Sequence, residues 1–285
     1  MVREVLNALA IQSGAVVVDA TVGLGGHAQA LLQAIGPKGR LIAIDRDAEA
    51  LVAARQRLEP FAKQIIWAQA PFAETGRVLS ENGITHIDAA LMDLGVSSLQ
   101  LDKPERGFSF MREGPLDMRM DASQESSAAT LINHASQLEL TELIRDYGEE
   151  NFAGRIARAI VERRPFVTTT QLAETIRKAV PSSGSHGKID ASTRTFQAIR
   201  IAVNGELDQL HEGLVQLIQA LKPEGRVAVL SYHSLEDRIV KVIFRDQSRE
   251  GIIECITQKP VRPSEDEVRG NPRSRSASLR AAKRK

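Results

Sequence analysis

The sequence predicts an α/β fold in which a doubly wound parallel sheet is interrupted by an inserted helical domain. Short apolar strands alternate with amphipathic helices over the first hundred residues and again near the C-terminus. This alternation is typical of a parallel sheet covered on both faces. Between residues 104 and 203, strand candidates are scarce and helical patterns predominate. We therefore expect a sheet domain of residues 1–103 and 204–285 and a helical domain of residues 104–203.

The expected strands of the sheet domain are short, apolar and bounded by turn signals. They cover residues 15–19, 40–45, 65–68, 88–93 and 225–231, with an edge strand at 252–258. The expected helices of this domain cover residues 1–9, 26–35, 47–58, 73–82, 206–221 and 235–246. In the helical domain we expect helices at residues 138–147, 152–164 and 170–179 and a loop at 181–187.

The bulk composition is that of a globular chain, with 42% hydrophobic and 26% charged residues in 285. Cys255 is the only cysteine, which excludes an intrachain disulfide and favours a reducing compartment. We find neither a signal-peptide pattern nor an apolar run long enough to span a bilayer. We therefore expect a cytoplasmic protein without a membrane partner, and we predict no metal site. The oligomeric state is left open, a dimer being one option.

The net charge of +1 does not indicate a nucleic-acid partner, but the C-terminal tail is locally basic. The tail contains only three acids and a larger number of basic residues. The basic residues are Arg262, Arg269, Arg273, Arg275, Arg280, Lys283, Arg284 and Lys285. A basic tail of this kind is typical of proteins that contact the phosphates of nucleic acids. A solvated, frayed terminus is an equally good interpretation.

A glycine-rich loop follows the first expected strand and leads into the next helix. Its pattern Gly23-x-Gly25-x-x-Ala28 matches the dinucleotide-binding fingerprint. Asp45 ends the next strand about twenty residues further on, where an acid can bind ribose hydroxyls. These features alone fit a nicotinamide enzyme as well as a methyltransferase.

Asp19, at the start of this loop, discriminates between the two ligands. In a dinucleotide fold the first glycine follows the strand directly, so that pyrophosphate lies at the helix N-terminus. Here residues 19–22 intervene, and the carboxylate would repel pyrophosphate but suit a cationic ligand. Adenosylmethionine carries a sulfonium and an ammonium and no phosphate, so the loop favours a methyltransferase. The structural alternative for Asp19 is an aspartate that caps the loop, and the structural alternative for the glycines is an ordinary tight turn.

Asp93 ends the fourth expected strand. In an open parallel sheet, ligands bind outside the carboxyl ends of the strands, near the point where the strand order reverses. Asp19, Asp45 and Asp93 would all lie at that edge. Three acids at successive strand ends are difficult to explain by packing, because buried carboxylates need partners.

The sequence resembles the ribosomal RNA small-subunit methyltransferase H family, also called the MraW family, over nearly its whole length. The most specific segment is Glu105-Arg-Gly-Phe-Ser-Phe-Met-Arg-Glu-Gly-Pro-Leu-Asp-Met-Arg-Met-Asp121. The other matching segments are residues 25–27, 44–47, 92–98, 147–150, 155–160, 193–204, 231–241 and 271–277.

The resemblance implies a bacterial enzyme with a class I methyltransferase fold. It implies methylation of the exocyclic N4 of one cytidine in the decoding region of small-subunit (16S) ribosomal RNA, with S-adenosyl-L-methionine as the cofactor. The cofactor contacts that it implies are Gly25, Gly26, His27, Asp45, Phe72, Asp93 and Gln100. The loop argument adds Asp19 to this set.

Two side chains are candidates for catalysis. The cytosine N4 lone pair is delocalised into the ring, so acceptors that hold its hydrogens would direct it towards the methyl group. We expect Asp93, or a backbone carbonyl of residues 94–98, to be that acceptor. His233 is the second candidate, with a cap for the following helix as its structural alternative.

The helical domain is the expected substrate-recognition surface. Phe108 and Phe110 could stack on bases. The arginines that could contact phosphates are Arg106, Arg112, Arg119, Arg155, Arg158, Arg163, Arg164, Arg194 and Arg200. A DNA or protein methyltransferase, or a non-catalytic ribosomal-RNA-binding assembly factor, would be the alternative functions.

The chain departs from the family pattern in a few places. The family usually has a His-x-Pro-Val-Leu stretch before the first helix, so a start upstream of Met1 is one interpretation. Leu99 replaces a usual proline beside Gln100, and Tyr232 replaces a usual phenylalanine. Ala122 and Gly205 also differ from the usual residues.

Overall fold

The computed structural model describes residues 1–181 and 190–285. It divides into two compact units, which we call the sheet unit and the helical unit. The sheet unit comprises Met1–Gly95 and Leu207–Lys285, and the helical unit comprises Val96–Glu206. The helical unit thus begins at residue 96 where the sequence suggested 104, and ends at 206 where it suggested 203. The loop expected at residues 181–187 falls, apart from its first residue, outside the described ranges.

The sheet unit is built on a seven-stranded sheet of order β3-β2-β1-β4-β5-β7-β6. Strands β1 to β5 pair in parallel, whereas β7 is antiparallel to both β5 and β6. Their bounds are β1 Val16–Asp19, β2 Arg40–Asp45, β3 Ile65–Gln69, β4 Ile87–Asp93, β5 Leu221–Ser231, β6 Ile253–Cys255 and β7 Ser278–Arg284. The predicted doubly wound α/β fold is confirmed.

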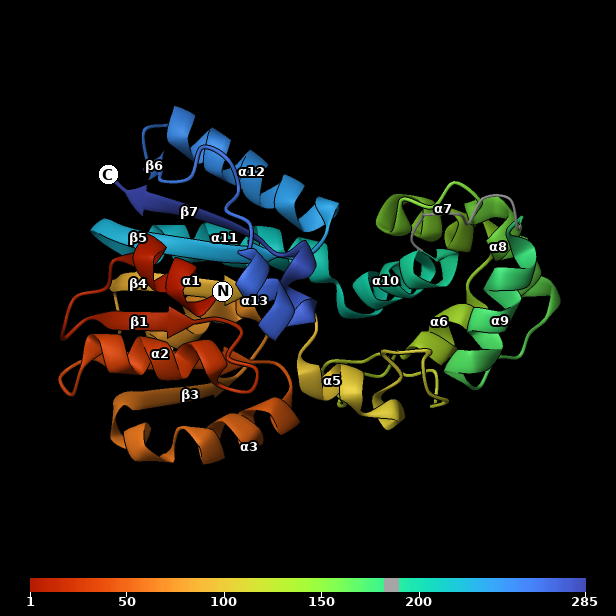
Figure 1. Ribbon diagram of the computed structural model, residues 1–285, viewed down its shortest axis with the longest axis horizontal. Coiled ribbons are helices and arrows are strands. Elements are labelled where there is room, and N and C mark those ends of the chain that lie inside the picture. The colour runs from red at the N-terminus through yellow and green to blue at the C-terminus, as the bar shows by residue number, and fades with distance from the viewer. Residues whose placement is uncertain (182–189) are drawn as a thin grey trace. The chain divides into compact units, whose positions relative to one another are not determined.

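Helices cover both faces of the sheet (Figure 1). Neighbouring residues of a strand point to opposite faces, so Val17 packs with one layer and Val18 with the other. The first layer holds α1 Val2–Leu9, α2 Gly26–Ile35 and α3 Ala48–Arg57, and the second holds α4 Thr75–Glu81, α11 Glu206–Ala220 and α12 Ser234–Arg249. Shorter elements of the unit are η1 Glu59–Gln64, η2 Phe72–Glu74, α13 Glu265–Gly270 and η5 Pro272–Ser276.

The strand β7 corrects the interpretation of the C-terminal tail. Residues 278–284 are an interior strand of the sheet and therefore not a frayed terminus. Arg280 forms two hydrogen bonds with Asp237 at 2.8 and 2.9 Å, and Lys283 lies 3.0 Å from Glu224. These partners neutralise the charges that made the segment resemble a solvated tail.

The helical unit has a hydrophobic core of its own, which includes Leu140, Ile156, Ile176 and Phe196. The side chain of Asn204 joins the long loop of residues 107–127 to this core, since it donates to the carbonyl of Met118 at 2.8 Å. Its elements are α5 Ser98–Asp102, η3 Pro104–Arg106, α6 Ala128–His134, α7 Gln137–Gly148, α8 Ala153–Glu162, α9 Thr169–Ala179 and α10 Ala191–Asn204.

The strand order places a topological switch point between β1 and β4. The chain passes from β1 to β2 and β3 on one side, and then continues with β4 and β5 on the other. Ligands of such sheets bind in the crevice outside the carboxyl ends of the strands at this point. Among the described residues, no helix is long and apolar enough to cross a membrane.

Candidate functional site

Three acidic residues lie at the carboxyl edge of the sheet, each as the last residue of a strand. Asp19 ends β1, Asp45 ends β2 and Asp93 ends β4. The register pairs Asp19 with Ala43 of β2 and Leu91 of β4, so the other two acids lie two residues beyond it. The predicted gathering of the three acids at one edge is therefore what the structure contains.

The loop after β1 is fastened to both neighbouring strands. The N–H of Gly23 donates to Asp45 Oδ2 at 2.8 Å, and the N–H of Asp93 donates to Thr21 Oγ1 at 2.6 Å. Gly25 has φ of 78°, a conformation that strains residues with a Cβ. A Cβ at Gly25 would also lie 3.2 Å from Leu58 Cδ1. The loop thus requires glycine for reasons of conformation and of space.

Helix α2 begins directly after this loop, with Gly26 and His27 as its first residues. No side chain caps its N-terminus. The first amides of a helix have no acceptor within the helix, and the macrodipole makes this end partially positive. The start of α2 therefore offers backbone donors to an anionic group beside the three acids.

Asp19 is completely buried. Its Oδ1 accepts a hydrogen bond from the N–H of Thr21 at 3.2 Å, whereas its Oδ2 has no hydrogen-bond partner within the described part of the chain. Burial raises the pKa of Asp19 to about 7; His27 and the Thr21 N–H oppose this rise, and the charges of Asp93 and Asp45 add to it. A buried carboxylate with an unsatisfied oxygen is suited to a cationic or donor-bearing ligand.

Asp45 has a structural task in addition to the ribose contact predicted for it. Its Oδ2 accepts from the N–H of Gly23, and its Oδ1 accepts from the N–H of Asp47 at 2.9 Å. Burial raises its pKa to about 6, against the lowering effect of these two hydrogen bonds. Each carboxylate oxygen has a second lone pair, so the side chain can still accept from a hydroxyl.

Asp93 is held between two side chains. His27 Nδ1 lies 3.1 Å from Asp93 Oδ2, and the hydroxyl of Tyr232 donates to Asp93 Oδ1 at 2.7 Å. Burial acts to lower the pKa of His27, but the hydrogen bond and charge of Asp93 outweigh it, so the pKa is raised. His27 Nε2 is buried and has no hydrogen-bond partner among the residues that the structure describes. Tyr232 was not among the predicted site residues.

Phe72 lies shortly after β3, in the turn η2. It is partly buried against the second hydrophobic layer. Helix α11 approaches it at Gly213, where a Cβ would lie 2.7 Å from the carbonyl oxygen of Phe72. The close approach of α11 thus holds the backbone at Phe72, and its contact with an adenine ring stays a prediction.

The remaining two predicted residues have local structural partners. His233 is the N-cap of α12: its Nδ1 accepts from the N–H of Glu236 at 3.4 Å, and its Nε2 lies 3.2 Å from Glu236 Oε1. The capping alternative accounts for His233 without a catalytic role. Gln100 belongs to the helical unit, where it is buried and its Oε1 accepts from the N–H of Ser97 in a capping box.

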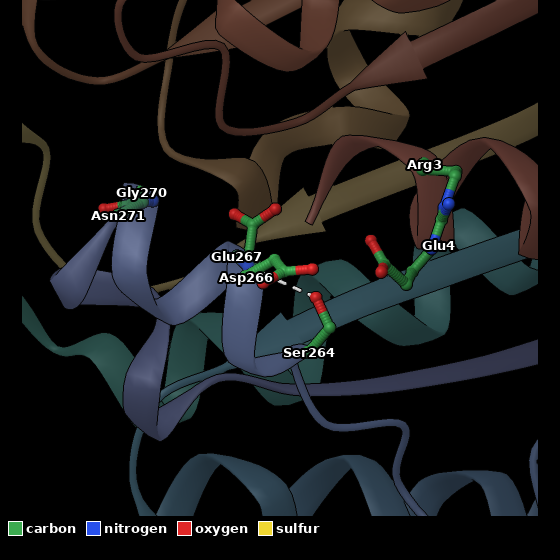
Figure 2. Close-up of a pocket in the computed structure, with 7 residues that line it drawn as sticks. All are labelled: Arg3, Glu4, Ser264, Asp266, Glu267, Gly270 and Asn271. Carbon is green, nitrogen blue, oxygen red and sulfur yellow. Dashed lines mark hydrogen bonds between the residues drawn. The ribbon is translucent and has the colours of Figure 1, made fainter.

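A separate pocket of about 430 Å³ lies on the sheet unit between the start of α1 and α13 (Figure 2). Arg3 and Glu4 line one side, and Asp266 and Glu267 of α13 line the other. The amino group of Met1 lies 2.9 Å from Glu267 Oε1. This pocket shares no residue with the acids at the strand ends, and we assign it no ligand.

Taken together, the strand-end acids favour one kind of ligand. The charge of Asp93 repels phosphate, and the unsatisfied oxygen of Asp19 suits a positive or donor-bearing group. The amides at the start of α2 suit a carboxylate. A ligand with a positive group, a carboxylate and ribose hydroxyls matches all of these features.

The chain matches the MraW methylase family over residues 1–285. It is 48% identical over 301 residues to the ribosomal RNA small subunit methyltransferase H of Methylococcus capsulatus, covering 100% of this chain and 99% of that protein. It is 47% identical over 302 residues to the protein of the same name from Syntrophotalea carbinolica, covering 100% and 96%.

Among solved structures, an rRNA methylase from Streptococcus thermophilus aligns with 99% of this chain and 93% of its own, at 13% identity and a TM-score of 0.46. TrmN from Thermus thermophilus aligns with 100% of this chain and 48% of its own, at 12% identity and a TM-score of 0.48.

The raised pKa of Asp19 predicts a pH-dependent effect of Asp19→Asn on stability. The folded chain holds the proton up to pH about 7, but the unfolded chain releases it near 3.8. The native protein therefore loses stability as the pH rises through this window, and the asparagine variant does not suffer this loss. We expect the variant to gain stability relative to the native chain between pH 5 and pH 8, measured by urea unfolding without ligand.

The control for this experiment is Asp266→Asn, at a side chain that is 92% exposed. It should change the pH dependence less than Asp19→Asn does. A free-energy difference between native and Asp19→Asn proteins that stays constant from pH 5 to pH 8 would show that Asp19 is not held as a buried acid.

Proposed function

This chain belongs to the MraW methylase family, and we propose that it methylates the exocyclic N4 of a cytidine in the decoding region of small-subunit ribosomal RNA, using S-adenosylmethionine. The observation that carries the proposal is the set of acids at the ends of β1, β2 and β4, with Asp19 completely buried, beside the uncapped start of α2. The names of the relatives support the RNA substrate.

The residues of the site fit the cofactor group by group. Asp19 has the buried, unsatisfied oxygen that a positive amino-acid group requires. The amides of Gly26 and His27 suit the α-carboxylate, and Asp45 suits the ribose hydroxyls. Phe72 is placed after β3 for the adenine. When bound, S-adenosylmethionine supplies an electrophilic methyl group on a sulfonium.

Asp93 is the side chain that we place at the acceptor nitrogen. The N4 amine is a weak nucleophile because its lone pair is delocalised, so a hydrogen-bond acceptor is needed to direct that lone pair. The two oxygens of Asp93 each contact one protein side chain, which leaves each a second lone pair. When the new N–C bond forms, one N4 proton must leave, and the Asp93 carboxylate can accept it. A backbone carbonyl of residues 94–98 is the alternative acceptor.

Most of the arginines predicted to contact RNA are engaged within the helical unit. Arg200 pairs with Glu206 at 2.8 Å, and Arg119 pairs with Asp117 at 2.7 Å. The other engaged arginines are Arg106, Arg112, Arg164 and Arg194. Their hydrogen bonds hold the long loop and the helices together, which accounts for these residues without RNA.

Three of the predicted arginines remain candidates for phosphate contacts. Arg155 and Arg158 are exposed on α8, one turn apart, and Arg163 follows the end of that helix. No hydrogen bond or ion pair links their side chains to other residues in the described ranges. We infer that the exposed side of α8 is the part of the helical unit that contacts RNA phosphates.

The two phenylalanines predicted to stack on bases serve the core instead. Phe108 is 8% exposed and belongs to the core of the helical unit. Phe110 packs edge-on against Phe196, with ring centroids 4.8 Å apart. This packing argues against the stacking role.

The target base must still leave its stack to reach the strand-end acids. We therefore propose an assembled or partly assembled subunit in the cytoplasm as the substrate.

The proposed function predicts the product of a defined reaction. Small subunits from a strain that lacks this enzyme are incubated with the protein and labelled S-adenosylmethionine, and the RNA is mapped by mass spectrometry. We expect one N4-methylated cytidine in the decoding region. Label in DNA or protein, or none in the subunit RNA, would contradict the proposal.

Asp93→Asn is the diagnostic variant for this assay. Removing a positioned proton acceptor should lower the single-turnover rate by about 10²-fold or more with the cofactor saturating. Saturation separates this effect from weaker cofactor binding. An unchanged rate would indicate that a backbone carbonyl of residues 94–98, and not Asp93, is the acceptor.

The RNA surface on α8 predicts a salt-dependent effect. Arg158→Gln should weaken binding to small subunits and reduce the slope of log affinity against log salt by about one, as loss of one phosphate contact does. The control is Arg145→Gln on α7, whose side chain is 58% exposed but paired with Asp146. Equal slopes for native, Arg158→Gln and control proteins would exclude α8 from the interface.

A further inference from the structure

We propose that Tyr232, which stands where the family usually has phenylalanine, is a positioning residue for methyl transfer in this chain, because its hydroxyl holds the carboxylate of Asp93 in a fixed orientation for the acceptor amine. This inference rests on the proposed function and deepens it. Tyr232 is the first residue after β5, whose end lies beside the end of β4. The N–H of Leu94 donates to the carbonyl of Leu230 at 3.0 Å, so the two strand ends are joined directly beside Asp93.

Tyr232 is itself held by contacts on both sides. Its N–H donates to Glu236 Oε2 at 2.7 Å, and Glu236 is a buried part of the capping box of α12. Its ring packs over Gly95, where a Cβ would lie 3.4 Å from the ring carbon Cδ2. The start of α12 and the backbone after β4 thus determine where the phenol points. The phenol points to Asp93 Oδ1.

The contacts of Asp93 restrict its carboxylate to one orientation. Tyr232 donates to Oδ1, His27 lies against Oδ2, and the backbone N–H of Asp93 donates to Thr21 Oγ1. A carboxylate held at both oxygens cannot rotate without breaking a charge-assisted hydrogen bond. The lone pairs that remain therefore keep fixed directions, which is what positioning of a reacting amine demands.

Tyr232 acts as a donor and not as a base. Burial raises its pKa well above the ordinary value for tyrosine, and the negative charges of Asp93, Glu236 and Glu267 raise it further. The phenol therefore keeps its proton throughout the working range of the enzyme. It cannot take the proton that leaves N4, so its contribution passes through Asp93.

The test is a double-mutant cycle on the single-turnover rate, with small subunits as the substrate and the cofactor saturating. Tyr232→Phe removes only the hydroxyl and keeps the ring contact with Gly95. We expect a fall of about tenfold in the rate, from loss of one hydrogen bond to a charged group. The dissociation constant for S-adenosylmethionine, measured by calorimetry, should change less than the rate does.

The second arm makes the same substitution in an Asp93→Ala background. With no carboxylate to hold, removal of the hydroxyl should cost less than about twofold, because residues that act as a unit are not additive. An equal loss in both backgrounds, or no loss in the first, overturns the role of Tyr232. Absence of methylation by the native protein in the same assay would instead reject the proposed function.

Discussion

The site depends on bringing three carboxylates together at one edge of a buried sheet. Like charges in a medium of low dielectric repel, and burial further disfavours the charged forms of Asp19 and Asp45. The surrounding residues offset this cost with donors: the N–H groups of Gly23 and Asp47 for Asp45, and the side chains of His27 and Tyr232 for Asp93. Asp19 keeps an oxygen without a partner. We propose that the positive group of the cofactor is the partner of this oxygen.

The features that could be predicted from the sequence are those that local pattern determines. Strands buried on both faces are short apolar runs, and an acid or glycine directly after such a run must lie at the carboxyl edge. The features that were missed depend on distant partners. Strand β7 looked like a basic tail because the acids that neutralise its charges are distant in the sequence. Asp237 pairs with Arg280, and Glu224 pairs with Lys283.

The same reason limited the predictions for single side chains. The hydroxyl of Tyr232 finds its acceptor 139 residues away, so its role could not be seen in its own segment. The pairing of Arg194 with Glu150 is similarly remote, and it removes an arginine from the predicted RNA surface. The arginines that remain candidates for RNA contact lie on the exposed side of α8 and directly after it. They are fewer than the arginines that the sequence suggested. Our proposal thus assigns chemistry at the strand ends and contact with RNA to separate units of the chain.

Calorimetry with S-adenosylmethionine tests most directly the proposal that the strand-end acids form the site for the cationic cofactor. A cation beside Asp19 would lower a pKa that burial raises to about 7, so binding should release a proton. We expect the affinity to rise between pH 5.5 and pH 8, and to rise less for S-adenosylhomocysteine, which lacks the sulfonium charge. An affinity that is independent of pH, or that falls as the pH rises, would contradict this account.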